Sequence, residues 1–89
     1  MSQTEATPVS RTQQEKVTRA VDDVIDELYS AMGEFGPFAS AHEGYAVILE
    51  EVDELWQEVK HGGTRTRARQ EAVQVAAMAL RFLVDVPAK

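Results

Sequence analysis

Residues 48–63 read ILEEVDELWQEVKHGG, a stretch of alternating apolar and acidic groups that ends at two glycines. At about 100° per residue, its apolar side chains and those just before it share one face of a helix. This face comprises Tyr45, Ile48, Leu49, Val52, Leu55, Trp56 and Val59. Ser40 with Glu43 is a capping-box pair, so we predict a helix from about Ser40 to His61. Tyr45 and Trp56 are expected to pack in the core.

After the glycines, the basic segment TRTRAR (residues 64–69) leads into a helix that is expected to run nearly to the end of the chain. Between residues 73 and 84 only Gln74 and Arg81 are polar. A helix this apolar belongs in the middle of a bundle or at a subunit interface. Arg81 needs a partner there, and Asp85 on the next turn is the simplest one.

The residues before this hairpin predict one more helix. Residues 1–10 are small and polar, and predict a disordered tail. Ser10 can cap a helix running to about Met32, on which apolar groups recur at helical spacing: Val17, Ala20, Val21, Val24, Leu28, Ala31 and Met32. We therefore predict a single all-α domain over residues 11–89, a helical hairpin preceded by an N-terminal helix.

Composition limits the chemistry. The 89 residues include no cysteine, which leaves carboxylate and imidazole groups for any metal site. The net charge of −6 opposes nonspecific attraction to nucleic acid or to an anionic membrane. No apolar run is long enough to cross a membrane and no leader pattern opens the chain, so we expect a cytoplasmic protein. A domain this small is expected to gain stability from a partner subunit.

The acidic residues of the 48–63 stretch are gathered on one side of its helix. Glu50 and Glu54 lie four residues apart and Glu51 and Glu54 three apart, so they repel each other unless a cation intervenes. In an antiparallel hairpin, Glu71 and Gln74 near the start of the last helix would face these acids. Three carboxylates and one amide oxygen from two helices suit Mg²⁺ or Mn²⁺. The alternative is a solvated acidic face.

Three segments resemble the MazG-like nucleoside triphosphate pyrophosphohydrolases, in particular the short single-domain forms of phages and bacteria. These are FASAHEGY (38–45), EEVDELWQEV (50–59) and EAVQVAAMALRF (71–82), and the likeness covers roughly residues 35–85. The resemblance implies an all-α fold whose subunits form four-helix bundles in a homodimer or homotetramer. It also implies cleavage of a nucleoside triphosphate into monophosphate and pyrophosphate, with Mg²⁺ held by E-E-x-x-E and a later E-x-x-D.

By position, the first motif falls on Glu50, Glu51 and Glu54, and the second on Glu71 and Gln74. The resemblance thus implies Glu51, Glu54, Glu71 and Gln74 as ligands of Mg²⁺, with Mn²⁺ as the alternative ion. It leaves Glu50 as the catalytic group that takes a proton from the attacking water or orients it. Gln74 departs from the motif, because an amide offers one neutral oxygen and lowers the charge of the site by one.

A triphosphate near these acids needs positive charge as well as metal. The candidates for binding its phosphates are Arg65, Arg67, Arg69 and Lys60. The basic segment is equally well explained as a solvated turn. His42 is a candidate for stacking on a base or binding a phosphate, with a surface or capping role as the alternative.

The sequence supports three functions. The leading one is a Mg²⁺-dependent pyrophosphohydrolase acting on nucleoside or deoxynucleoside triphosphates. The second is an interaction protein that keeps the fold without the activity, with Gln74 marking a relaxed metal site. The third is a related hydrolase acting on nucleoside diphosphates or phosphoribosyl nucleotides.

Overall fold

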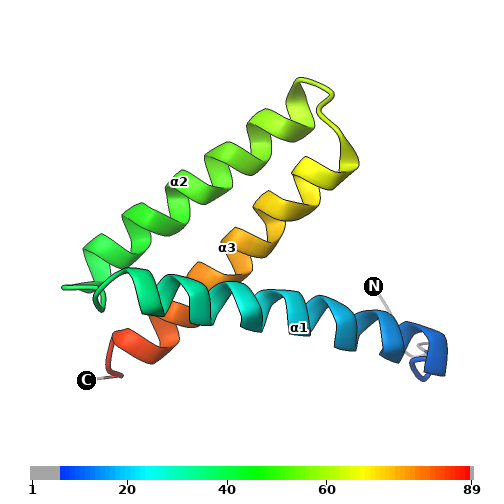
Figure 1. The fold of residues 1–89 in the computed structure, drawn as a ribbon, viewed down its shortest axis with the longest axis horizontal. Helices are drawn as coiled ribbons and strands as arrows, with labels where there is room; N and C mark the ends of the chain where they lie inside the picture. The colour runs from blue at the N-terminus through cyan, green and yellow to red at the C-terminus, as the bar shows by residue number, and fades with distance from the viewer. Residues whose placement is uncertain (1–6, 89) are drawn as a thin grey trace, which may run out of the picture.

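The computed structural model describes residues 7–88 and contains three α-helices, with no strand among these residues (Figure 1). The helices are α1 (Arg11–Glu34), α2 (Ala41–Lys60) and α3 (Arg65–Asp85). The all-α prediction and the helical hairpin are therefore confirmed. Of the predicted tail, residues 1–6 lie outside the described part of the chain, and residues 7–10 have no regular secondary structure. None of the three helices is both long and apolar enough to cross a membrane.

Side-chain caps set where α2 and α3 begin. The Ser40 hydroxyl accepts a hydrogen bond from the Glu43 amide at 3.1 Å, but the Glu43 carboxylate accepts from the Ala39 amide at 2.7 Å. The reciprocal half of the predicted capping box is thus shifted by one residue. The Thr64 hydroxyl caps α3 by accepting from the Arg67 amide at 3.1 Å. The basic segment is therefore the first turn of α3 and not a loop.

The two glycines close the α2–α3 hairpin. Gly62 has a φ of 69°, in the left-handed region where a side chain is disfavoured. The Gly63 amide donates to the Glu58 carbonyl at 2.9 Å, which satisfies one carbonyl at the end of α2. The chain then reverses, so that α2 and α3 lie side by side and antiparallel (Figure 1).

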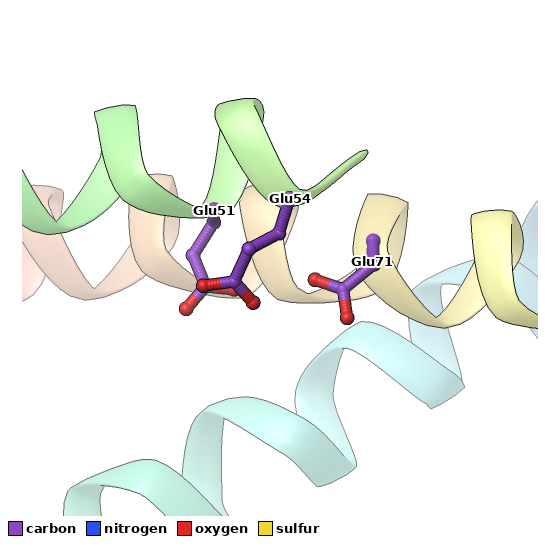
Figure 2. A group of neighbouring side chains, drawn as sticks. All are labelled: Glu51, Glu54 and Glu71. Carbon is purple, nitrogen blue, oxygen red and sulfur yellow. The ribbon is translucent and has the colours of Figure 1, made fainter. Parts of the chain in front are cut away.

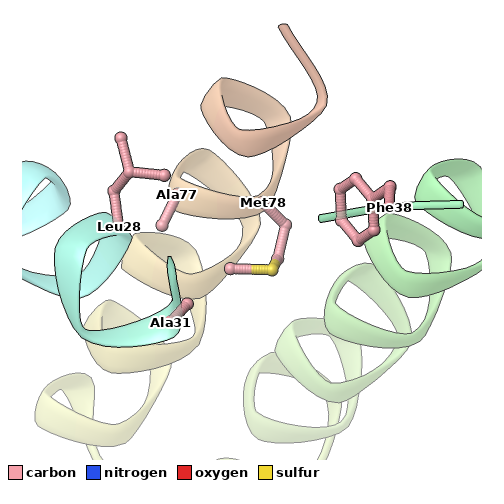
Figure 3. Packing of buried hydrophobic residues seen from close by; sticks show 5 residues of the cluster. All are labelled: Leu28, Ala31, Phe38, Ala77 and Met78. Carbon is pink, nitrogen blue, oxygen red and sulfur yellow. The ribbon is translucent and has the colours of Figure 1, made fainter. Parts of the chain in front are cut away.

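Helix α3 is the central element, because both α1 and α2 pack against it. The buried cluster contains Leu28 and Ala31 from α1, Phe38 from the connector, and Ala77 and Met78 from α3 (Figure 3). Of the two predicted places for the apolar third helix, the middle of a bundle or a subunit interface, the single chain shows the first. Packing of α1 and α2 on one helix also determines which side chains surround the acidic residues.

Arg81 attaches the connector between α1 and α2 to α3. Its side chain is buried and forms an ion pair with Asp85 at 3.4 Å, as predicted. The guanidinium group also donates to the Gly36 carbonyl and lies 4.1 Å from the centre of the Phe38 ring. Asp85 in turn accepts from the Phe38 amide at 3.0 Å. The buried charged group of the apolar helix thus has structural partners.

The prediction that the apolar face of α2 lies in the core is wrong for most of that face. Only Ile48 and Leu55 are half-buried, whereas five of its members are between 41 % and 63 % exposed. These five form what we call the apolar strip: Tyr45, Leu49, Val52, Trp56 and Val59. The physical reason is that α3 covers only one side of α2, and the covered side is centred nearer the half-buried Glu51 and Glu58.

Candidate metal centre

Three carboxylates converge where the end of α2 faces the start of α3. Glu51 and Glu54 are three residues apart on α2, so their side chains leave the helix on the same side. Glu71 comes from the first half of α3, which the hairpin places beside them (Figure 2). One oxygen from each of the three lies within 4.8 Å of the others. We call these three residues the carboxylate triad.

The triad gathers like charges, and among residues 7–88 none of its carboxylates forms an ion pair within 4.0 Å. Burial raises the pKa of Glu51, and the charges of Glu54, Glu71, Glu50 and Glu27 raise it further. Burial also raises the pKa of Glu71, followed by the charge of Glu54. One oxygen of Glu71, Oε2, is buried and has no hydrogen-bond partner among residues 7–88. A bound cation would remove both penalties, because it pairs the buried oxygen and neutralises the repulsion.

The donor set suits a hard divalent cation. Mg²⁺ holds oxygens at about 2.1 Å, so two of its ligands lie at most about 4.2 Å apart. Oxygens within 4.8 Å of one another therefore need only a small inward rotation of side chains. Glu54 is exposed and free to make that rotation, while the half-buried Glu51 and Glu71 define the floor of the site.

Gln74, the fourth predicted ligand, lies beside the triad on the side of α1. It is half-buried and lines a hollow of about 550 Å³ between α1 and α3, which Glu71 also lines. We call this the inner hollow. Asp23 and Glu27 of α1 line it too. Sequence reasoning missed them, because α1 lies outside the resemblance, which covers roughly residues 35–85. Their four-residue spacing was the only available sign.

The other predicted site residues are distributed around this centre. Glu50 is exposed and outside the triad, although its charge affects Glu51. Arg69 lines the inner hollow, whereas Arg65 and Arg67 are exposed and do not line it. The structure therefore brings one of the three predicted arginines to the acids.

His42 and Lys60 are not brought to the triad of the same chain. His42 lies nine residues before Glu51, about 14 Å along the helix, and lines a separate apolar groove between α2 and α3. The Lys60 ammonium lies 5.9 Å from the centre of the Trp56 ring, beside the apolar strip. Their predicted roles in binding substrate thus have no support from the geometry of the single chain.

Comparisons of the chain with protein-family models, with curated proteins and with solved structures give no match. The fold and the site therefore define only a class: a three-helix, all-α protein with a carboxylate triad across a helical hairpin.

Proposed function

We propose that the protein is a Mg²⁺-dependent nucleoside triphosphate pyrophosphohydrolase of the MazG-like type. It would cleave a ribo- or deoxynucleoside triphosphate into the monophosphate and pyrophosphate. The observation that carries the proposal is the triad itself, in which residues of both motifs meet across the hairpin. Within residues 7–88, Glu71 Oε2 has no hydrogen-bond partner. An acidic pocket accepts a polyanionic substrate only through cations, which makes metal binding and phosphate chemistry a consistent pair.

In the proposed reaction Glu51, Glu54 and Glu71 hold the ion, and Gln74 adds a neutral oxygen from the next turn of α3. The bound ion would be Mg²⁺ or Mn²⁺, and it supplies neutralisation of the phosphates and of the charge on the departing pyrophosphate. Glu50 takes the proton of a water whose oxygen attacks the α phosphorus. The bond from that phosphorus to the α–β bridging oxygen breaks, and the electron pair leaves with pyrophosphate.

We further propose that the working form is a homodimer or homotetramer built from four-helix bundles. The apolar strip on α2 supports this, because a chain of this kind rarely leaves so much apolar surface in water. The radius of gyration is 15.6 Å, compared with about 12 Å expected for a compact 89-residue domain. No large side chain among residues 7–88 is fully buried. Two hairpins packed through their apolar strips would form one bundle.

The test is pyrophosphate release from a panel of ribo- and deoxynucleoside triphosphates with Mg²⁺ or Mn²⁺. We expect monophosphate plus pyrophosphate from the wild type and none from Glu51→Gln. Asp53→Asn is the matched control, because Asp53 is an exposed acid of the same helix and lies outside the triad. Equal activity in Glu51→Gln and the wild type would overturn the proposed role of the triad.

A second candidate is a protein that keeps this fold for interaction without hydrolysis. Gln74 favours it, because an amide replaces the acid of the second motif. An inactive protein whose melting temperature does not respond to Mg²⁺ would support this candidate. Activity on diphosphates alone would support the third reading, a related hydrolase.

A further inference from the structure

The inner hollow continues into a second hollow further from the triad. This outer hollow, about 430 Å³, shares Asp23 and Arg69 with the inner one. Its remaining lining comes from α1, at Lys16, Arg19 and Ala20. From the triad towards the N-terminus of α1, the charged lining therefore changes from mainly carboxylates to mainly cations.

The cations of the outer hollow come from two helices and converge on one space. Lys16 and Arg19 lie on α1, one turn apart, and Arg69 lies on α3. Asp23 offsets one of these three positive charges. Among residues 7–88 the one ion pair within 4.0 Å joins Arg81 to Asp85, so the three cations have no carboxylate partner there. In a chain with a net charge of −6, this local excess of positive charge suits an anionic ligand.

We propose that the outer hollow is a subsite for the terminal phosphate of the substrate, and that it selects triphosphates over diphosphates. The inference rests on the proposed function, since it places the inner phosphates at the triad. A triphosphate held there extends its last phosphate away from the acids. Arg69 is the first cation on that path, two residues or about 3 Å along the helix from Glu71. Its planar guanidinium pairs with phosphate oxygens through two donors.

The test compares the binding of inorganic tripolyphosphate and pyrophosphate in Mg²⁺ by isothermal titration calorimetry. The wild type is expected to bind tripolyphosphate more tightly. Arg69→Gln is expected to reduce that preference by about three- to tenfold, the contribution of one partly exposed charge-assisted contact. Arg19→Gln reduces it less, and Arg69→Lys retains part of it. Both positions, Arg19 and Arg69, are exposed, so the fold should survive.

Arg67→Gln is the matched control, because it removes the same charge from the same helical turn but from outside both hollows. Its preference for tripolyphosphate should equal that of the wild type. The proposal is overturned if Arg67→Gln loses as much preference as Arg69→Gln, if Arg69→Gln retains the full preference, or if the wild type binds neither ion.

The measurement separates this inference from the proposed function because it requires no turnover. If the preference for tripolyphosphate depends on Arg69 but the protein cleaves no nucleotide, the subsite is supported and the proposed pyrophosphohydrolase activity is contradicted. If the protein cleaves triphosphates but the preference for tripolyphosphate does not depend on Arg69, the pyrophosphohydrolase activity is supported and the subsite is contradicted.

Discussion

Glu51 on α2 and Glu71 on α3 bring carboxylate oxygens within 4.8 Å of each other, although 20 residues separate them in the chain. Both are half-buried, and burial raises the pKa of each. Like charges this close lower the stability of the metal-free fold. The pair therefore links the stability of the hairpin to cation binding, which makes stability a direct readout of the site.

Removal of one triad carboxylate should stabilise the metal-free protein and abolish its response to Mg²⁺. Without metal, we expect Glu71→Gln to gain about 0.5 kcal/mol, or roughly 2–4 °C in melting temperature, because repulsion is relieved. Mg²⁺ at about 100 times its Kd should stabilise the wild type by about 2.7 kcal/mol. Thermal melts with and without Mg²⁺ measure both effects. Asp53→Asn should keep the full metal response, and a similar response in Glu71→Gln would contradict the triad as the site.

The raised pKa values of Glu51 and Glu71 predict a decline of metal-free stability with pH. Between the unperturbed value of 4.5 and the raised values, the folded protein holds more protons than the unfolded chain. The free energy of unfolding therefore falls as pH rises through this window and levels off above it. Urea unfolding of the wild type and Glu71→Gln across pH 4–8 should show a difference with this shape. Saturating Mg²⁺ should remove the pH dependence of this difference in unfolding free energy. If the wild type instead becomes more stable than Glu71→Gln as pH rises, the predicted direction of the effect is wrong.

Asp85→Ala should be among the most destabilising single substitutions in the chain. It leaves the buried Arg81 guanidinium without its carboxylate and the Phe38 amide without its acceptor. Loss of one partner of a buried ion pair costs about 3 kcal/mol, a large share of the stability of a small domain. In a double-mutant cycle, Arg81→Ala with Asp85→Ala should cost less than the two single changes added together. Strict additivity would show that the ion pair contributes little.

Substitution by alanine should have opposite effects on stability at two glycines of the chain. A Cβ at Gly44 would lie 2.6 Å from Cδ2 of Phe82 and 3.1 Å from Cδ2 of Phe38, so Gly44→Ala should force α2 away from α3 and cost about 1–3 kcal/mol. Gly33 lies within α1, and apart from its chain neighbours and the adjacent helix backbone no atom of the described residues lies within 4 Å of an added Cβ. Gly33→Ala should therefore gain about 0.5–1 kcal/mol through reduced chain entropy and better helix propensity. Chemical denaturation of both variants decides the matter.

A charge on the apolar strip should disrupt the proposed assembly. Trp56→Glu is expected to convert the oligomer to monomer, because burial of an unpaired carboxylate at the interface is costly. Size-exclusion chromatography with light scattering gives the mass, and circular dichroism checks that the helices remain. Tyr29→Glu on α1 is the control, since Tyr29 is exposed but outside the strip. A wild type that is monomeric at high concentration would contradict the assembly itself.

Much of the fold could be predicted because it depends on interactions between residues that are close in the sequence. Ser10 and Ser40 cap helices as predicted, by hydrogen bonds within three residues, and Gly62 has the left-handed φ that the hairpin turn requires. Thr64 caps α3 in the same way, although the basic segment was predicted to lead into that helix and not to open it. Once the turn is known, an antiparallel hairpin and helical periodicity place Glu71 opposite Glu51. The partner of Arg81 was also predictable, since Asp85 lies one turn away on the same helix.

The rest could not be predicted, because it depends on how whole helices pack. The apolar arc of α2 is wider than α3 can cover, so Tyr45 and Trp56 stay exposed in the single chain despite their apolar pattern. The inclusion of Asp23 and Glu27 in the lining of the inner hollow follows from the packing of α1 on α3, which no spacing within α1 encodes.

The sequence by itself thus determined three helices, the caps at Ser10 and Ser40, the hairpin turn and the convergence of the acids across it, since each follows from residues close in the chain. Tertiary structure alone decided which side of α2 is covered and which arginine lies beside the acids. It also decided that charged side chains of α1 line the inner hollow. These depend on the packing of helices against one another, where side-chain shape and available area, not periodicity, select the contact.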